Sequence, residues 1–296
     1  MAGPGLAATL AGWAPEPTEA TDVITAGPAL GLAGLFDAPP PVTKPDDLLP
    51  PLWHWLYFLA RPAELELGPD GHPASGPFMP PIPRRRRMFA GGRVTWHAPV
   101  RCGDTLTRRS ELAGWTVRQG HTGELLFVTV RDTFSREGCL VVTEEQDLVY
   151  RSSPAGPEAA PPPAAAPTPA AASAAAAAPD GQWRLGLIAD PVLLFRFSAL
   201  TYNAHRIHYD AAYATEVEGH PGLVVHGPLL ALLMLELPRR HLTGRPVTEL
   251  TFRARSPVYA GDAFTVSGGM RGSECDLRVT AAAGHDAMTA LARVAA

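Results

Sequence analysis

The chain has 296 residues and a formal net charge of −4, and 46% of its residues are hydrophobic. This length predicts about two domains, and the slight negative charge disfavours a nucleic-acid-binding protein, which needs a cationic surface. The three cysteines form none of the CxxC pairs of a zinc site or of a disulfide framework. The first residues lack the basic and apolar regions of a signal peptide, and no uninterrupted apolar stretch of about 18 residues follows, so we expect a cytoplasmic protein without a membrane span.

A segment made almost entirely of alanine and proline divides the chain. Between residues 154 and 179, only Gly156, Glu158, Thr168 and Ser173 are neither Ala nor Pro. Prolines remove amide donors and favour extended backbone, so this segment can continue neither a helix nor a sheet. The sequence predicts four parts, namely an N-terminal extension over 1–44, an N-terminal unit over 45–153, a linker over 154–182 and a C-terminal unit over 183–296.

Both units show an apolar helical segment followed by segments with strand character. In the first unit a helix is expected over 49–62, and strands over 92–100, 104–119, 123–136 and 139–151. In the second unit a helix is expected over 222–241, and strands over 246–258, 263–271, 274–284 and 287–295. This order predicts an α+β protein in which an antiparallel sheet wraps round a central helix in each unit.

A short turn motif recurs at the same point of both units. PVRCGDTL over 99–106 and PVYAGDAF over 257–264 share the pattern P-V-x-x-G-D. The repeat favours gene duplication, and an ordinary Gly-Asp turn between strands is the alternative interpretation.

Polar residues are concentrated directly before the apolar helix of the second unit. They are Ser198, Thr201, Asn203, His205, Arg206, His208 and Asp210. Further along, Pro228 follows His226 and Gly227, and proline is favoured at the first position of a helix. We therefore expect a helix to begin there with the Gly227 amide at its positive end, where it could stabilise an oxyanion.

Three short sequence strings resemble one family. NAHRIHYD over 203–210, HGPL over 226–229 and PRRRRMFAGG over 83–92 are similar to the MaoC-like double hotdog hydratases. The closest resemblance is to the branch that holds mitochondrial-type 3-hydroxyacyl-thioester dehydratase and the mesaconyl-CoA and itaconyl-CoA hydratases. It covers most of the chain from about residue 45, apart from the linker. The resemblance implies a double hotdog fold. It also implies a hydro-lyase that either adds water to an enoyl thioester of coenzyme A or forms one by removing water.

The resemblance also implies the catalytic residues, with one departure from the family. When His208 is placed on the histidine of the motif D-x-N-P-[apolar]-H, Asn203 takes the position of the aspartate. His208 is then the expected base, because an imidazole with an ordinary pKa of about 6.5 is largely neutral at pH 7. Asn203 would orient the water, and the Gly227 amide would hold the thioester oxygen. This chemistry requires neither a metal nor a redox cofactor.

Four further residues are candidates for substrate binding. Arg206 could contact a carboxylate of the acyl group or could pair with Asp210, and His226 could fix the loop before the helix. Arg85 and Arg86 belong to a run of four arginines that suits the phosphates of coenzyme A or forms a solvated loop. His205 and His208 lack an obvious third ligand, so no metal site is expected.

Two other functions stay open at this point. A thioesterase needs a carboxylate for water attack on the carbonyl; residues 198–208 hold none, although Asp210 follows closely. A non-catalytic acyl-binding subunit is the second alternative, because the aspartate of the motif is missing. Two hotdog units in one chain can pair internally, which leaves both a monomer and a homodimer open.

Overall fold

The computed structural model describes residues 5–82, 85–120, 123–152 and 182–295. Nearly all of the predicted linker over 154–182 lies outside these ranges. Among the described helices, none has the length and apolar character that a membrane crossing demands.

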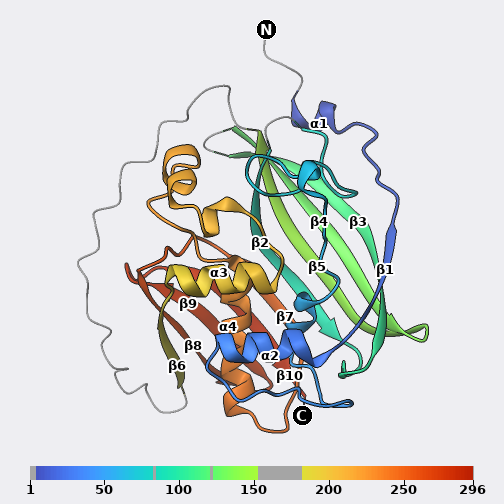
Figure 1. Cartoon of the computed structure of the whole chain (residues 1–296), viewed down its shortest axis with the longest axis vertical. Helices are drawn as coiled ribbons and strands as arrows, with labels where there is room; N and C mark the ends of the chain where they lie inside the picture. Colours follow the sequence, from blue (N-terminus) through green and yellow to red (C-terminus); the bar gives the residue numbers. More distant parts are fainter. Residues whose placement is uncertain (1–4, 83–84, 121–122, 153–181, 296) are drawn as a thin grey trace.

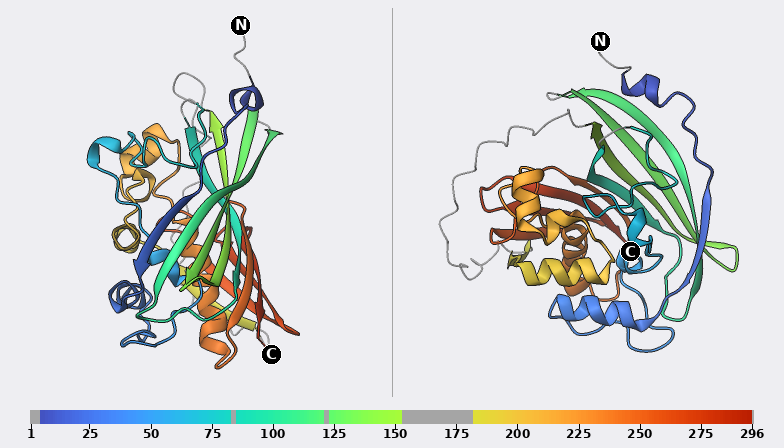
Figure 2. Two further views of the ribbon diagram at one scale, coloured as in Figure 1. Left: turned by 90° about the vertical axis from the view of Figure 1, so that its right-hand side faces the viewer. Right: turned by 45° about the horizontal axis from the view of Figure 1, so that its top comes forward.

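In the described residues, ten strands form one antiparallel sheet with the helices on one side of it (Figures 1 and 2). The strands of the first half are β1 (Thr18–Val23), β2 (Arg85–Trp96), β3 (Thr105–Gly120), β4 (Gly123–Arg136) and β5 (Cys139–Ser152). Those of the second half are β6 (Gln182–Ile188), β7 (Val247–Ala254), β8 (Ala263–Arg271), β9 (Glu274–Ala281) and β10 (Asp286–Val294). The α-helices are α1 (Leu6–Thr9), α2 (Ala26–Leu35), α3 (Pro191–Leu200) and α4 (Gly227–His241). Shorter turns are the 3-10 helices Trp53–Leu56, Glu64–Glu66 and Arg206–His208 and a π-helical turn over Tyr213–Val217.

The order of the strands shows that the two halves repeat one topology. Across the sheet the order is β1-β3-β4-β5-β2-β7-β10-β9-β8-β6, so the second half repeats the first when it is read from the opposite edge. The halves meet where β2 and β7 pair, with Gly91 opposite Arg253 and Thr95 opposite Glu249. The two predicted sheets are thus joined into one.

The repeated turn motif has the same role in both halves. Gly103 and Gly261 both have a positive φ, of +97° and +89°, which favours glycine at these positions. The Gly103 N–H donates to the carbonyl of Ile24 (2.7 Å), and the Gly261 N–H donates to that of Ala189 (2.8 Å). These two carbonyls directly precede α2 and α3, so the two helices are equivalent. The match supports duplication of a single unit.

Much of the predicted N-terminal extension belongs to the first unit. β1 pairs with β3 along its whole length, and Ile24, Leu32 and Val42 are completely buried in the core. α2 lies beside α3, its counterpart (Figure 1). The repeating unit therefore begins at β1 rather than at residue 45. The strand TEATDV is short and mostly exposed, and it has too little apolar periodicity to be recognised in the sequence.

The central helix is present in the second half alone, among the described residues. α4 is buried from Leu229 to Pro238 and packs against the sheet, as the sequence predicts. The helix predicted over 49–62 is wrong, because this segment forms a single 3-10 turn at Trp53–Leu56. Leu52 before the turn and Phe58 after it have left-handed φ values of 68° and 56°, which end the helical geometry.

The two halves differ in their backbone N–H groups at the position of Gly227, the first residue of α4. The Leu49 N–H donates to the carbonyl of Val100 (2.9 Å), between β2 and β3. The Val225 N–H donates to the carbonyl of Val258 (2.8 Å), between β7 and β8. In this register Pro51 takes the place of Gly227. Because proline has no N–H, the first half offers no donor there.

Candidate active site

His208 lies in the 3-10 turn that follows α3 and is 7% exposed. Its Nδ1 lies 2.7 Å from the carbonyl oxygen of Val224. A carbonyl can only accept, so Nδ1 carries the hydrogen of the neutral ring and Nε2 keeps a free lone pair. Burial lowers the pKa of His208 to about 4, against a smaller opposing effect of the Val224 bond. The imidazole is therefore a neutral base at pH 7.

The His226 ring stacks on that of His208, with centroids 3.6 Å apart and planes 19° apart. His226 is the residue before the first turn of α4 and is completely buried. Its Nε2 lies 2.9 Å from the Ser198 hydroxyl, and its Nδ1 has no hydrogen-bond partner among the described residues. This stack holds the predicted base against the beginning of the apolar helix.

Gly227 begins α4, where the amides of the first turn have no acceptor within the helix. A Cβ atom on Gly227 would lie 2.7 Å from Cδ1 of Phe89, a residue of β2. The close approach of this ring requires glycine. The first half of the chain thus covers the helix end that the second half presents.

Asn203 ends the segment that leads away from α3. At the beginning of α3, the Asp190 side chain accepts from the Leu193 backbone amide (2.7 Å). After the helix ends, the backbone N–H of Asn203 donates to the Ser198 carbonyl (2.8 Å). The side-chain oxygen of Asn203 accepts from the His205 amide (3.0 Å). Its NH₂ group is left as the donor that could hold a water molecule.

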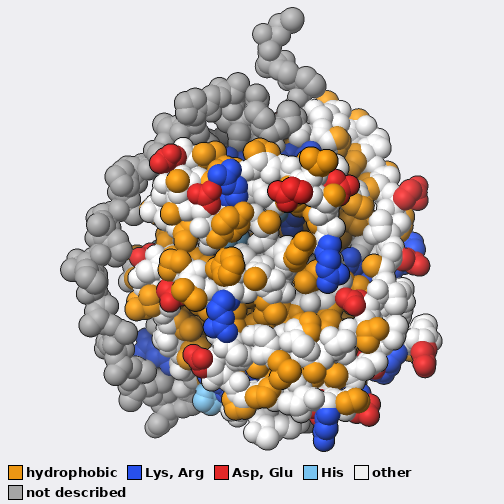
Figure 3. Space-filling model, viewed as in Figure 1, with side chains coloured by type: hydrophobic (Ala, Val, Ile, Leu, Met, Phe, Trp, Pro, Cys, Tyr) orange, Lys and Arg blue, Asp and Glu red, His pale blue; other side chains and the backbone are white. Residues whose placement is uncertain are grey.

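A cavity of about 350 Å³ lies beside this segment. Its polar lining residues are Glu64, His72, Ser198, Tyr202, Asn203 and Tyr209. Ser198 contacts His226, and Asn203 contacts His205. The cavity therefore lies next to these two histidines. In the space-filling view, hydrophobic side chains gather across the part of this face where α2 and α3 lie (Figure 3). Because Leu67, Phe195 and Ala199 also line it, the cavity can accept a small, partly apolar group.

A loop of the first half supplies two site residues that sequence reasoning missed, Asp70 and His72. Gly71 between them has a φ of +86°, and a Cβ atom there would lie 1.9 Å from the Ala204 carbonyl oxygen. The Arg206 amide donates to the Asp70 carbonyl (2.9 Å), which fixes the loop to the 203–210 segment. The turn sequence GPDGHP over 68–73 is the signal that could have drawn attention to the loop.

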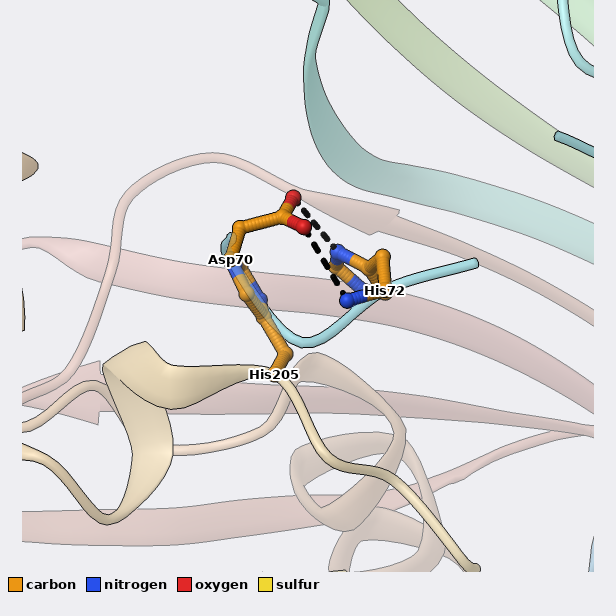
Figure 4. Close-up of side chains that lie close together, drawn as sticks. All are labelled: Asp70, His72 and His205. Carbon is orange, nitrogen blue, oxygen red and sulfur yellow. Dashed lines mark hydrogen bonds and ion pairs between the residues drawn. The ribbon is translucent and has the colours of Figure 1, made fainter. Parts of the chain in front are cut away.

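Asp70, His72 and His205 lie together (Figure 4). Asp70 accepts from the His72 ring Nδ1 (3.2 Å) and from the His72 backbone amide (3.0 Å). Burial raises the pKa of Asp70, but the bonds and charge of His72 outweigh it, and the net pKa is below the ordinary value. Burial, aided by neighbouring charges, lowers the pKa of His205 to about 2. Asp70 is thus a carboxylate and His205 a neutral ring at pH 7.

The same three residues form a donor set that a metal ion could use, since one ligand atom of each lies within 4.8 Å of the others. The third ligand that the 203–210 segment lacks would come from the distant loop. The His72 and His205 rings pack against each other with centroids 4.0 Å apart, and the Asp70 carboxylate binds His72. These contacts join the donors to one another rather than directing them at a common centre.

Arg206 pairs with Asp210, one of its two predicted roles. Its Nη2 lies 2.7 Å from the Asp210 carboxylate, its Nη1 donates to the Pro69 carbonyl (3.0 Å), and its guanidinium lies 4.1 Å from the centroid of the Tyr213 ring. Asp210 in turn accepts from the Tyr213 amide (3.0 Å). Both charged groups hold the segment in place.

Arg85 and Arg86 lie in β2 and not in a solvated loop. Arg85 donates to the carbonyls of Pro80 (3.1 Å) and Ala74 (2.5 Å), and Arg86 donates to that of Val217 (3.1 Å). Both side chains hold loops that border the site. A role in binding coenzyme A phosphates stays a prediction.

Comparison with known proteins decides the family. Residues 52–260 match the family described as hydroxyacyl-thioester dehydratase type 2. The chain is 42% identical over 279 residues to a mesaconyl-C(4)-CoA hydratase from Chloroflexus aurantiacus, with 94% of each chain covered. The chain belongs to the hydroxyacyl-thioester dehydratase type 2 family.

Solved structures agree with this family in fold. HtdX of Mycobacterium tuberculosis is 15% identical with a TM-score of 0.62, and the alignment covers 94% of this chain and 99% of that chain. Another Mycobacterium tuberculosis protein, described as having a double hotdog fold, is 17% identical with a TM-score of 0.56, over 95% and 96% of the two chains. The predicted family, double hotdog fold and hydratase or dehydratase class are confirmed.

This dehydratase-family chain also holds a second buried polar cluster, in its first half. Glu144 is 1% exposed and accepts from the His54 ring (2.8 Å), the Trp55 indole (2.8 Å) and the Gln146 amide (2.7 Å). Burial raises the pKa of Glu144, but His54 and the other donors outweigh it, and the net pKa is lowered. These bonds fix the turn that replaces the predicted helix.

Proposed function

We propose that this protein hydrates an enoyl-CoA whose acyl group carries a free carboxylate, as in mesaconyl-C4-CoA. The name of the 42% identical relative supports this substrate class. The observation that carries the reaction type is the neutral His208 ring, with its Nε2 lone pair free, stacked on the residue that precedes α4. A base and a helix-end amide are the two groups that water addition to a conjugated thioester requires.

The reaction can be followed bond by bond. His208 Nε2 takes a proton from water as the water oxygen bonds to the β-carbon, and the electrons of the double bond move onto the thioester oxygen. The Gly227 amide stabilises this oxyanion by about 3 kcal/mol, the magnitude typical of one such donor. The proton on His208 then passes to the α-carbon. The Asn203 side-chain NH₂ positions the water, while its oxygen is occupied by the His205 amide.

We propose that this addition uses neither a metal nor a redox cofactor. No atom changes its overall oxidation state by electron transfer to another molecule, because water adds across one bond. The proposed base, amide and water-holding residue all come from one chain, so a homodimer would contain two complete sites.

The test is an assay of mesaconyl-C4-CoA with the wild-type protein and with His208→Ala. Loss of the conjugated-thioester absorbance is followed together with free thiol, and His97→Ala, an exposed histidine that contacts Thr143 on the sheet, is the control. We expect absorbance loss without thiol release in the wild type and the control, and almost none in His208→Ala. Thiol release by the wild type would identify a thioesterase, and inertness toward every thioester would identify a binding protein.

A further inference from the structure

A substrate with a second carboxylate needs a cationic partner close to the base. In mesaconyl-C4-CoA the thioester is at C4 and the double bond joins C2 and C3, so water attacks C2. The free carboxylate is bonded to that same carbon. A buried carboxylate without a partner is strongly unfavourable, so the partner must lie within a few ångströms of the attacked atom.

The two arginines between the beginning of α3 and Asp210 are occupied elsewhere. Arg206 is bound to Asp210, to the Pro69 carbonyl and over the Tyr213 ring. Arg196 is an exposed residue of α3 and donates to the carbonyl of Gly34 in α2 (3.3 Å). Neither guanidinium lines the cavity.

His72 is the candidate partner for this carboxylate. Of the described residues that line the cavity, it is the one that can carry a positive charge. Its ring packs against His205 (centroids 4.0 Å apart), and the His205 ring lies 5.4 Å from that of His208. His72 is thus one ring away from the proposed base, on the same side as Asn203 and Ser198.

The contact with Asp70 prepares His72 for an anion. The Asp70 carboxylate accepts from Nδ1, which fixes the ring plane and leaves Nε2 for a ligand. With a hydrogen on each ring nitrogen, His72 donates from Nδ1 to Asp70 and from Nε2 to a substrate carboxylate, so one ring bridges the two acceptors. The loop itself is held by the Arg206 amide and by the close contact of Gly71 with Ala204.

We propose that His72, oriented by Asp70, binds the free carboxylate of the substrate and thereby selects dicarboxylic enoyl thioesters. This inference rests on the function proposed above. Because His72 comes from the first half and His208 from the second, each half supplies one part of the acyl site. Specificity then depends on the first half and the chemical step on the second.

The test compares two substrates that differ at one group. 3-Methylcrotonyl-CoA carries a methyl group where mesaconyl-C4-CoA carries the carboxylate, and isovaleryl-CoA and 2-methylsuccinyl-C4-CoA are their unreactive saturated counterparts. For His72→Asn we expect the kcat/KM of mesaconyl-C4-CoA to fall about 100-fold, as for truncation of a buried charge pair. The inhibition constant of 2-methylsuccinyl-C4-CoA should rise by a similar factor, while that of isovaleryl-CoA changes less than about threefold. Asp70→Asn, which keeps an acceptor oxygen, should show the same selectivity loss at about tenfold.

The controls separate this role from general damage. His97→Asn makes the same change at an exposed site that contacts Thr143, and it should leave both inhibition constants unchanged. Equal losses for the carboxylated and the carboxylate-free ligands in His72→Asn would overturn the proposal, as would no loss for either. If the wild type hydrates mesaconyl-C4-CoA and His72→Asn still prefers the carboxylated ligand, this inference alone is overturned. A wild type that hydrates only carboxylate-free thioesters overturns the proposed substrate as well.

Discussion

The rings of His208 and His226 lie face to face, 3.6 Å apart, in the buried space before α4. Burial lowers the pKa of both groups, and a charge on either ring would repel a charge on the other. The two nevertheless differ, because the Val224 carbonyl fixes the tautomer of His208, whereas Nδ1 of His226 has no partner among the described residues. The pair therefore holds one ring ready to accept a proton and uses the other as its support.

The first prediction concerns the base. His208→Ala should lower kcat by about a thousandfold, within the range for loss of a general base, while Asn203→Ala should lower it about tenfold, as for loss of one orienting hydrogen bond. Steady-state hydration kinetics of the two variants give the comparison. Equal losses, or an active His208→Ala protein, would reject the assignment of the base.

The second prediction concerns the contact between Gly227 and Phe89. In Gly227→Ala the new methyl group would lie 2.7 Å from the Phe89 ring, so the ring or the beginning of α4 must move. We expect a lower thermal midpoint and a lower kcat, because the amide is displaced from the thioester oxygen. Adding Phe89→Leu should restore part of both. If the double variant is no better than Gly227→Ala, the clash is not the cause.

The third prediction is the pH dependence of stability. The pKa of His208 in the folded protein is about 4, below the value of about 6.5 expected when the chain is unfolded. Between these two values the unfolded state binds the additional proton, so stability is full above about pH 6.5 and falls as the pH drops toward 4. His208 contributes a slope of up to about 1.4 kcal/mol per pH unit. Urea unfolding at several pH values should show a shallower slope for His208→Gln, and identical slopes would contradict the burial effect.

The sequence predicted eight of the ten strands in the described residues, mainly because these strands end at glycine turns. It missed β1 and β6, and β2 begins at Arg85 rather than at residue 92. β4 over Gly123–Arg136 and β8 over Ala263–Arg271 agree with the predicted ranges to the residue. The 203–210 string and the beginning of α4 at Gly227 were also found, because local turn chemistry marks both. These features depend on neighbours in the chain.

The features that sequence reasoning missed depend on distant contacts. The aromatic segment after Pro51 has helical spacing, but Glu144 binds two of its side chains and holds it as a turn. Asp70 and His72 precede the site segment by more than a hundred residues, and only the folded chain brings them to His205. No spacing rule connects positions that meet across two halves of a sheet.

The fourth prediction concerns the buried cluster of the first half. In Glu144→Gln the side chain loses its charge and one of its acceptor positions, so at least one of His54, Trp55 and Gln146 is left without a partner. We expect a loss of about 2 kcal/mol of unfolding free energy, as for a buried donor that is left without an acceptor. Denaturant titration measures this loss. The kcat at a temperature where the variant is folded should be close to the wild-type value, and a large fall in kcat would show that the cluster takes part in the reaction.

The fifth prediction separates the close contact of Gly71 from its backbone conformation. Gly71 and Gly12 have the same φ of +86°, but a Cβ atom on Gly71 would lie 1.9 Å from the Ala204 carbonyl oxygen, whereas one on Gly12 would meet nothing within 4 Å. Alanine at either position costs about 1 kcal/mol of backbone strain. In Gly71→Ala the loop must also move away from the 203–210 segment and carry His72 with it. We expect Gly71→Ala to lose more stability than Gly12→Ala because of the added clash, and only Gly71→Ala to raise the KM for mesaconyl-C4-CoA by tenfold or more. An unchanged KM would show that the loop keeps its function without this contact.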